Sequence, residues 1–188
     1  MALKGRIEYE DARVRQEGSF KLFLTGPDSL SFLIEGPLHV DVFRMIILGE
    51  DAHLLSSEDE GWRILHKGER VAVAEYGVDN ISPFLTGLFA FPQYFIRALD
   101  GETGPGEYGF SWDDEPFTCR AARKQMEFSI SQKNSGIKAV YGGRKDFENG
   151  FYPSKIEITN APGSWRITLN IDAVRVNPQI PQSVWLPE

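Results

Sequence analysis

The run that decides the fold lies near the C-terminus and reads Trp165-Arg166-Ile167-Thr168-Leu169-Asn170-Ile171-Asp172-Ala173-Val174-Arg175-Val176. Apolar residues alternate with polar ones from Trp165 to Ile171, which is typical of a β-strand with one buried face. Val174 and Val176 then continue the alternation in the opposite phase. Because a shift by one residue turns every side chain to the other face, we predict a bulge or sharp bend near Asp172-Ala173. Such bends let an antiparallel sheet curl toward a barrel.

Most of the chain shows the same alternation. Strands are therefore predicted across residues 3–76 and 106–176, with a helical segment at about 82–99 and a tail at 177–188. A length of 188 residues suits one domain with its own core, so 1–188 is interpreted as a single domain. Shorter alternating runs predict three further strands. Two of them, at 52–56 and 62–66, are predicted to form a hairpin, and the third lies at 71–76.

The segment from 40 to 48 differs because it is apolar on both faces. Val42 and Ile46 fall on one face, and Phe43 and Met45 fall on the other. A strand of this kind needs cover on each side, which in an antiparallel protein usually means a helix or a lid over one face. For the strand at 20–24, the sequence leaves open whether Phe20, Leu22 and Leu24 or Phe23 point inward.

Residues 79–99 break the strand pattern. Ser82 before Pro83 is a good helix start, and Pro92 marks a second start, so two short helices are predicted. After Pro83 the only charged side chain of the segment is Arg97. The run is shorter than the roughly 20 residues that a membrane span requires. Two interpretations stay open, a buried pair of core helices and an apolar lid over a curved sheet.

Composition excludes several classes of function. A formal net charge of −7 argues against nucleic acid as a partner. The single cysteine excludes an internal disulfide framework and a Cys-based zinc cluster. The opening residues Met1-Ala2-Leu3-Lys4-Gly5 contain neither an apolar signal segment nor an acylatable cysteine. Either the chain is cytoplasmic, or an export signal precedes Met1.

No local motif supports an enzyme. His39, His53 and His66 have a spacing that matches no metal motif, and Cys119 lies in a strand-like run without a nearby histidine. Asp113-Asp114-Glu115 lacks the alternating pattern of a calcium loop and fits a hairpin tip. We therefore expect no catalytic residue, no metal and no cofactor, and a site assembled from distant strands is the open alternative.

Three features together resemble the lipoprotein-localisation (Lol) carrier and receptor superfamily. The first is the opening series of strands, Leu3-Lys4-Gly5-Arg6-Ile7, Ser19 to Leu24 and Asp28 to Ile34. The second is the helix pair around Pro83-Phe84-Leu85 and Pro92-Gln93-Tyr94-Phe95. The third is the tail, Pro153-Ser154-Lys155-Ile156-Glu157-Ile158 followed by Thr168 to Pro178. The resemblance covers most of the chain and rests on pattern.

This resemblance implies a mainly β fold, an unclosed antiparallel barrel of about eleven strands with a two-helix lid over an apolar cavity. In such proteins the cavity accepts acyl chains of lipoproteins or similar lipids. The chain departs from the receptor members at Glu58, Asp59 and Glu60, which stand where an apolar hairpin tip is expected. The cavity lining is expected to come from the lid and the facing strands, namely Leu22, Leu24, Phe32, Ile34, Phe43, Met45, Phe84, Leu88, Phe89, Phe95 and Ile96.

The predicted function is non-enzymatic binding of lipid or lipoprotein acyl chains, since each buried methylene contributes about 0.8 kcal/mol. The resemblance implies a role in lipoprotein transport or insertion at the bacterial outer membrane. The alternative is a structural or interaction protein of the envelope with a filled barrel and no ligand. We further expect a monomer that binds no nucleic acid and associates with membranes peripherally or through a lipid anchor. Its expected location is the periplasm-facing envelope, or otherwise the cytoplasm.

Overall fold

The computed structural model is almost entirely β. It describes residues 1–26, 29–49, 51–56, 61–66, 70–73, 76–79, 88–89, 106–112, 115–122, 127–132, 137–147, 150–160 and 163–186. The strands of the first half are β1 (Ala2–Asp11), β2 (Arg15–Gly26), β3 (Ser29–Glu35), β4 (Asp41–Leu48), β5 (Asp51–Ser56), β6 (Arg63–Leu65), β7 (Arg70–Val73) and β8 (Tyr76–Asp79). Those of the second half are β9 (Gly106–Trp112), β10 (Glu115–Ala122), β11 (Glu127–Gln132), β12 (Ile137–Gly142), β13 (Lys145–Phe147), β14 (Gly150–Tyr152), β15 (Lys155–Asn160) and β16 (Trp165–Arg175). Short 3-10 helices lie at Pro37–His39 and Gln182–Trp185.

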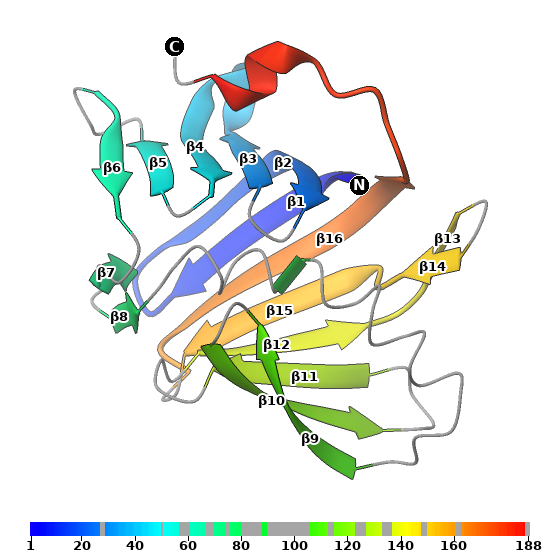
Figure 1. The fold of residues 1–188 in the computed structure, drawn as a ribbon. Coiled ribbons are helices and arrows are strands. Elements are labelled where there is room, and N and C mark those ends of the chain that lie inside the picture. The colour runs from blue at the N-terminus through cyan, green and yellow to red at the C-terminus, as the bar shows by residue number, and fades with distance from the viewer. Residues whose placement is uncertain are drawn as a thin grey trace.

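One curved antiparallel sheet of twelve strands dominates the molecule (Figure 1). Its order is β6-β5-β4-β3-β2-β1-β16-β15-β12-β11-β10-β9, so the first and last strands are neighbours at its centre. The hairpins β7–β8 and β13–β14 form separate two-stranded sheets. Within the described chain the edge strands β6 and β9 do not pair with each other. The prediction of an unclosed antiparallel sheet is thus confirmed, with twelve strands rather than about eleven, and closure into a barrel is not observed.

The predicted bulge is present between β1 and β16. Lys4 faces Ala173, but Gly5 faces Ile171, which leaves Asp172 as the extra residue. Gly5 suits this crossing because a Cβ atom there would lie only 1.9 Å from the carbonyl oxygen of Asn170. The bulge changes the phase of β16, and it contributes to the curvature of the sheet.

Two sequence-based expectations need correction or lie outside the described chain. Residues 71–76 are not one strand, because the chain turns back and pairs Val71 with Val78 and Val73 with Tyr76. The two-helix lid at about 82–99 lies outside the described residues except for Leu88 and Phe89, which are helical.

The end of the chain, which includes the short 3-10 helix Gln182–Trp185, lies against part of the outer face of β4. Ile46 is fully buried, although it lies opposite the core residues Met45 and Ile47. Its cross-strand neighbour Ser31 donates a hydrogen bond of 2.8 Å to the carbonyl oxygen of Val184. Figure 1 shows this C-terminal segment in red beside β3 and β4. The expectation that β4 is covered on both faces is confirmed, with an unexpected segment as the cover.

Candidate functional site

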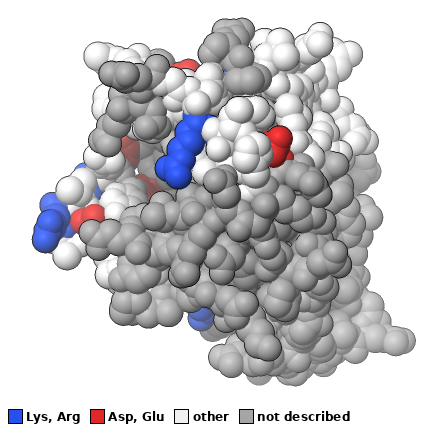
Figure 2. All heavy atoms as spheres, turned by 60° about the vertical axis from the view of Figure 1, so that its left-hand side comes forward, with Lys and Arg blue, Asp and Glu red and all other residues white. Residues whose placement is uncertain are grey.

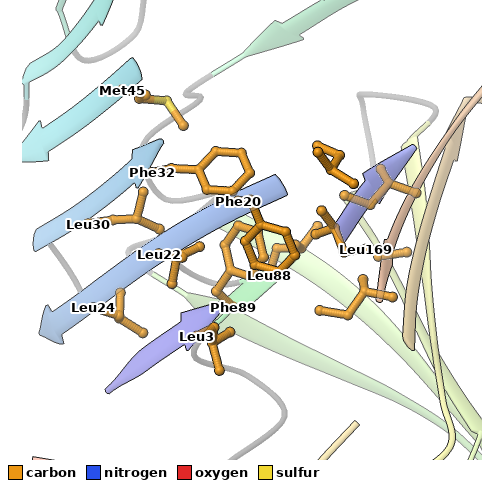
Figure 3. Packing of buried hydrophobic residues seen from close by; sticks show 14 of the residues in the cluster. Leu3, Phe20, Leu22, Leu24, Leu30, Phe32, Met45, Leu88, Phe89 and Leu169 are labelled. Carbon is orange, nitrogen blue, oxygen red and sulfur yellow. The ribbon is translucent and has the colours of Figure 1, made fainter. Parts of the chain in front are cut away.

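The inner face of the sheet carries a continuous apolar surface. One row of facing residues crosses the first half of the sheet, namely Leu3, Leu22, Phe32, Met45 and Leu54. A second row crosses the other half, namely Ile7, Leu169, Ile156 and Tyr141. Both rows belong to one buried cluster, part of which Figure 3 shows. The open choice on β2 is settled, because Phe20, Leu22 and Leu24 are buried whereas Phe23 is half-exposed on the other face.

Phe32 is the centre of an aromatic group on this face. Its ring centroid lies 5.9 Å from that of Phe20 and 6.5 Å from that of Phe43. The ring of Phe89, from the described turn of the predicted lid, lies 5.7 Å away. These separations fall in the range of favourable tilted and edge-on contacts. The inner face of β2–β4 is therefore covered by a side chain from the middle of the chain (Figure 3).

Two tyrosines hold the helical turn of Leu88 and Phe89 in place. The hydroxyl of Tyr141 on β12 donates to the carbonyl oxygen of Leu88 at 2.7 Å. The hydroxyl of Tyr152 on β14 donates to the carbonyl oxygen of Phe89 at 2.9 Å. Burial raises the pKa of Tyr152, so this hydroxyl stays protonated and remains a donor. The turn is thus joined by hydrogen bonds to β12 of the large sheet and to the separate β13–β14 hairpin, and by aromatic contacts to the first half of the large sheet.

Most charged side chains of the first strands lie on the opposite, outer face. Glu35 is buried there and accepts hydrogen bonds from Lys21 Nζ at 2.8 Å and from the Ser19 hydroxyl at 3.2 Å. On the inner face the described buried cluster is hydrophobic, and Asp11, at the end of β1, is a charged residue beside it as the cross-strand partner of Trp165. An inner surface of this kind favours an apolar ligand and disfavours a charged one.

Wherever the structure describes the predicted lining residues, they lie in or against the buried cluster, and their role in lining a cavity stays a prediction. Leu22, Leu24, Phe32, Met45, Leu88 and Phe89 belong to the buried cluster, and Ile34 and Phe43 pack against it. Phe84, Phe95 and Ile96 lie outside the described residues. Tyr141 and Tyr152 were missing from the prediction. The only signal for Tyr141 was its position in the apolar phase of its strand, after Ile137 and Ala139, and nothing local marked Tyr152.

Two of the three histidines lie on or beside the β5–β6 hairpin. His66 Nδ1 lies 2.8 Å from Asp51 Oδ1 on the exposed outer side of the β5–β6 hairpin, and His53 lies on β5. Over the described ranges, no three His, Cys, Asp or Glu side chains are grouped so that they could hold a metal ion. In the same ranges, no helix has both the length and the apolar character needed to cross a bilayer.

The architecture matches that of a solved protein from Nitrosomonas europaea described as a LolA superfamily protein. The match has a TM-score of 0.57 at 11% identity, and it covers 98% of this chain and 89% of the other. The fold is similar to that of this LolA superfamily protein. The resemblance stated from the sequence is therefore confirmed at the level of fold.

Two further structures share the LolA-like fold. One is a domain from Vibrio parahaemolyticus provisionally described as an outer membrane lipoprotein-sorting protein, with a TM-score of 0.56, 7% identity, and coverage of 98% of this chain and 88% of that one. The other is a DUF1329 family protein from Desulfovibrio piger, with a TM-score of 0.55, 9% identity, and the same coverage of 98% and 88%. No protein-family model and no curated protein matches the sequence. The likeness to LolA-like proteins is thus carried by the chain path and not by sequence.

Proposed function

We propose that this protein binds the acyl chain of a lipid or lipoprotein against the inner face of its sheet. The observation that carries the proposal is the aromatic group in which Phe32 contacts Phe20, Phe43 and Phe89 within the hydrophobic cluster of the inner face. Phe89 is attached there from a separate segment, so its displacement would expose an apolar surface. Each acyl methylene buried in its place contributes about 0.8 kcal/mol. Binding of this kind needs no catalytic residue and no cofactor.

The LolA-like fold supports a role in the bacterial envelope. One of the structural neighbours carries a description as an outer membrane lipoprotein-sorting domain. By this analogy the protein is a monomeric carrier or receptor that faces the periplasm and handles lipoproteins. The analogy concerns fold, so the ligand is to be established by experiment.

A turn on the outside of the molecule supports peripheral contact with a membrane. Leu38, between β3 and β4, is 93% exposed and has a positive φ of 63°, and Val40 and Val42 beside it are also exposed. Because Leu38 is exposed to water on a strained turn, its side chain does not contribute to the core. Figure 2 brings the β4–β6 edge of the sheet forward, and the described atoms there are mostly uncharged. We propose that this turn inserts shallowly between lipid headgroups.

The binding proposal is tested on the purified protein. Organic extraction followed by mass spectrometry identifies co-purified lipid, and displacement of the apolar dye N-phenylnaphthylamine by lipids measures binding. Phe43→Ser should weaken dye binding several-fold, because Phe43 packs on the inner aromatic group. Val42→Ser is the matched control, since Val42 is the preceding residue and is exposed on the outer face.

Two outcomes would contradict the binding proposal. One is the absence of co-purified lipid together with no dye binding, which would favour the structural or interaction protein with a filled interior. The other is an equal loss of dye binding in Phe43→Ser and Val42→Ser.

The membrane proposal is tested separately by flotation with vesicles of phosphatidylethanolamine and phosphatidylglycerol. Leu38→Asn should reduce the floating fraction while leaving the fold intact, because asparagine tolerates positive φ better than leucine. Val176→Asn is the control, since Val176 is exposed at the opposite end of the sheet. Equal flotation of Leu38→Asn and the parent protein would exclude this turn as the site of membrane contact.

A further inference from the structure

Trp165, the first residue of β16, has an unsatisfied donor. Its side-chain nitrogen Nε1 is the one buried side-chain nitrogen or oxygen without a hydrogen-bond partner in the described part of the chain. The residue is only 3% exposed and belongs to the inner cluster with Leu169 and Ile171. Buried polar groups are nearly always paired, so an unpaired indole N–H on an apolar face indicates a missing partner.

The position of Trp165 is fixed by its neighbours. Its backbone N–H donates to Asn160 Oδ1 at 3.1 Å, and the side chain of Asn160 in turn donates to Ser164 Oγ at 2.8 Å. Ser164 is exposed and Trp165 is the first residue of β16, so Trp165 lies at the rim of the inner face. The neighbouring hydrogen bonds fix the backbone but leave the indole N–H itself without an acceptor.

We propose that the indole N–H of Trp165 binds a neutral oxygen of the ligand, an ester carbonyl or a hydroxyl, while the acyl chain lies along the apolar inner face. This inference rests on the proposed function, and it specifies the chemical class of the ligand. The rim position fits this division, because the polar end of the ligand would remain near water and the chain would run inward past Ile167 and Leu169.

The charge next to Trp165 favours a neutral oxygen over a carboxylate. Asp11 is the cross-strand partner of Trp165 on β1. Its carboxylate accepts hydrogen bonds from the Arg13 backbone N–H at 2.7 Å, the Val14 backbone N–H at 2.8 Å and the Tyr9 hydroxyl at 2.9 Å. The backbone hydrogen bond from Arg13, followed by that from the Tyr9 hydroxyl, holds the pKa of Asp11 below its ordinary value. An anionic Asp11 would repel a fatty-acid carboxylate at this position.

The test compares three fluorescent probes that differ at the polar end. Diphenylhexatriene is a pure hydrocarbon, methyl parinarate is a neutral ester, and parinarate is a carboxylate. Trp165→Phe retains the ring and removes the donor, so the affinity for methyl parinarate should fall about threefold to tenfold, the value of one hydrogen bond. The affinity for diphenylhexatriene should stay within about twofold. Trp185→Phe, which alters a tryptophan of the C-terminal segment, is the matched control.

A second readout observes the donor directly. The protein has four tryptophans, so ¹⁵N labelling gives four indole signals, and the one lost in Trp165→Phe identifies Trp165. This signal should shift downfield when methyl parinarate binds and should respond less to diphenylhexatriene.

The outcomes separate the two proposals. If diphenylhexatriene binds but Trp165→Phe leaves the affinity for methyl parinarate unchanged and the indole signal does not shift, the inference is wrong and the proposed function stands. If no probe binds the parent protein, both are wrong. Tighter, Trp165-dependent binding of parinarate than of its methyl ester would overturn the neutral class. If the indole N–H binds water and its signal stays fixed with every ligand, Trp165 is not the binding site for the polar end of the ligand.

Discussion

The hydroxyl of Tyr152 donates a hydrogen bond of 2.9 Å to the carbonyl oxygen of Phe89, a residue 63 positions earlier in the chain. Tyr141 makes the equivalent bond to the adjacent carbonyl of Leu88. Both acceptors are backbone atoms, so the contacts hold the path of the chain rather than a particular side chain. The turn that places Phe89 beside Phe32 is therefore held by one hydroxyl group from β12 and one from the separate β13–β14 hairpin.

Tyr152→Phe should destabilise the protein by about 1 kcal/mol, because the mutation removes the hydrogen bond between the buried Tyr152 hydroxyl and the carbonyl oxygen of Phe89. Urea unfolding measures this loss. It should be accompanied by faster entry of N-phenylnaphthylamine, since the turn of Leu88 and Phe89 is released. Tyr9→Phe is the control, because the Tyr9 hydroxyl bonds to Asp11 at a part-buried position away from that turn. Equal stability of Tyr152→Phe and the parent protein would argue against a role of this bond.

Ile46→Ala should cost about 2–4 kcal/mol although the residue lies on the outer face, because the C-terminal segment buries it completely. Leu48→Ala provides the comparison on the same strand and face. Leu48 is 41% exposed, and its replacement should cost less than about 1 kcal/mol. Chemical denaturation of both variants measures the loss in the free energy of unfolding. Similar losses for the two variants would mean that the C-terminal segment does not cover Ile46 in solution.

Gly5→Ala should destabilise the protein by about 2 kcal/mol or more, because the new methyl group would collide with the carbonyl of Asn170 at the bulge. Gly61→Ala is a suitable control, since a Cβ at that position would have no neighbour within 4 Å. The measurement is the thermal unfolding midpoint of each variant. A tolerated Gly5→Ala would show that the bulge can move.

The contribution of Asp11 to stability should depend on pH. Its pKa in the folded state is lowered from the ordinary value of 3.8, chiefly by the backbone hydrogen bond from Arg13. A carboxyl group with a depressed folded pKa stabilises the fold above its unfolded pKa, and this stabilisation is lost as the pH falls through the folded value. The parent protein should therefore lose its greater stability relative to Asp11→Asn below about pH 4. Thermal unfolding of both proteins from pH 2.5 to 7 checks this, and a constant difference would contradict it.

Much of the sheet could be predicted because the sequence pattern that specifies each strand is local. The alternation in β16 and the change of phase at Asp172 predicted both the strand and its bulge. The same period of two grouped the residues that are buried together on β2–β4, but it did not decide which face of β2 points inward. The apolar character of both faces of β4 correctly predicted cover on each side.

Other features depend on long-range contacts that no local pattern encodes. The end of the chain covers Ile46, but Gln182–Trp185 is too short and irregular to show a periodic signal. The bonds of Tyr141 and Tyr152 join segments far apart in sequence. Residues 71–76 were predicted as one strand because Ala74-Glu75 contains none of the usual turn formers. The unpaired N–H of Trp165 became visible only once the neighbours of the indole were known.

The position of β1 between β2 and β16 has a consequence for how the protein folds. Ala2 pairs with Arg175 and Asp11 pairs with Trp165, so the central ladder of the sheet joins the two ends of the chain. The strands β2–β6 and β9–β12 can form from neighbouring hairpins, but the two halves join only when β16 is available. Contacts of such high sequence separation slow folding. Until the last strand arrives, β1 presents a free edge to other chains, which makes incomplete chains prone to aggregation.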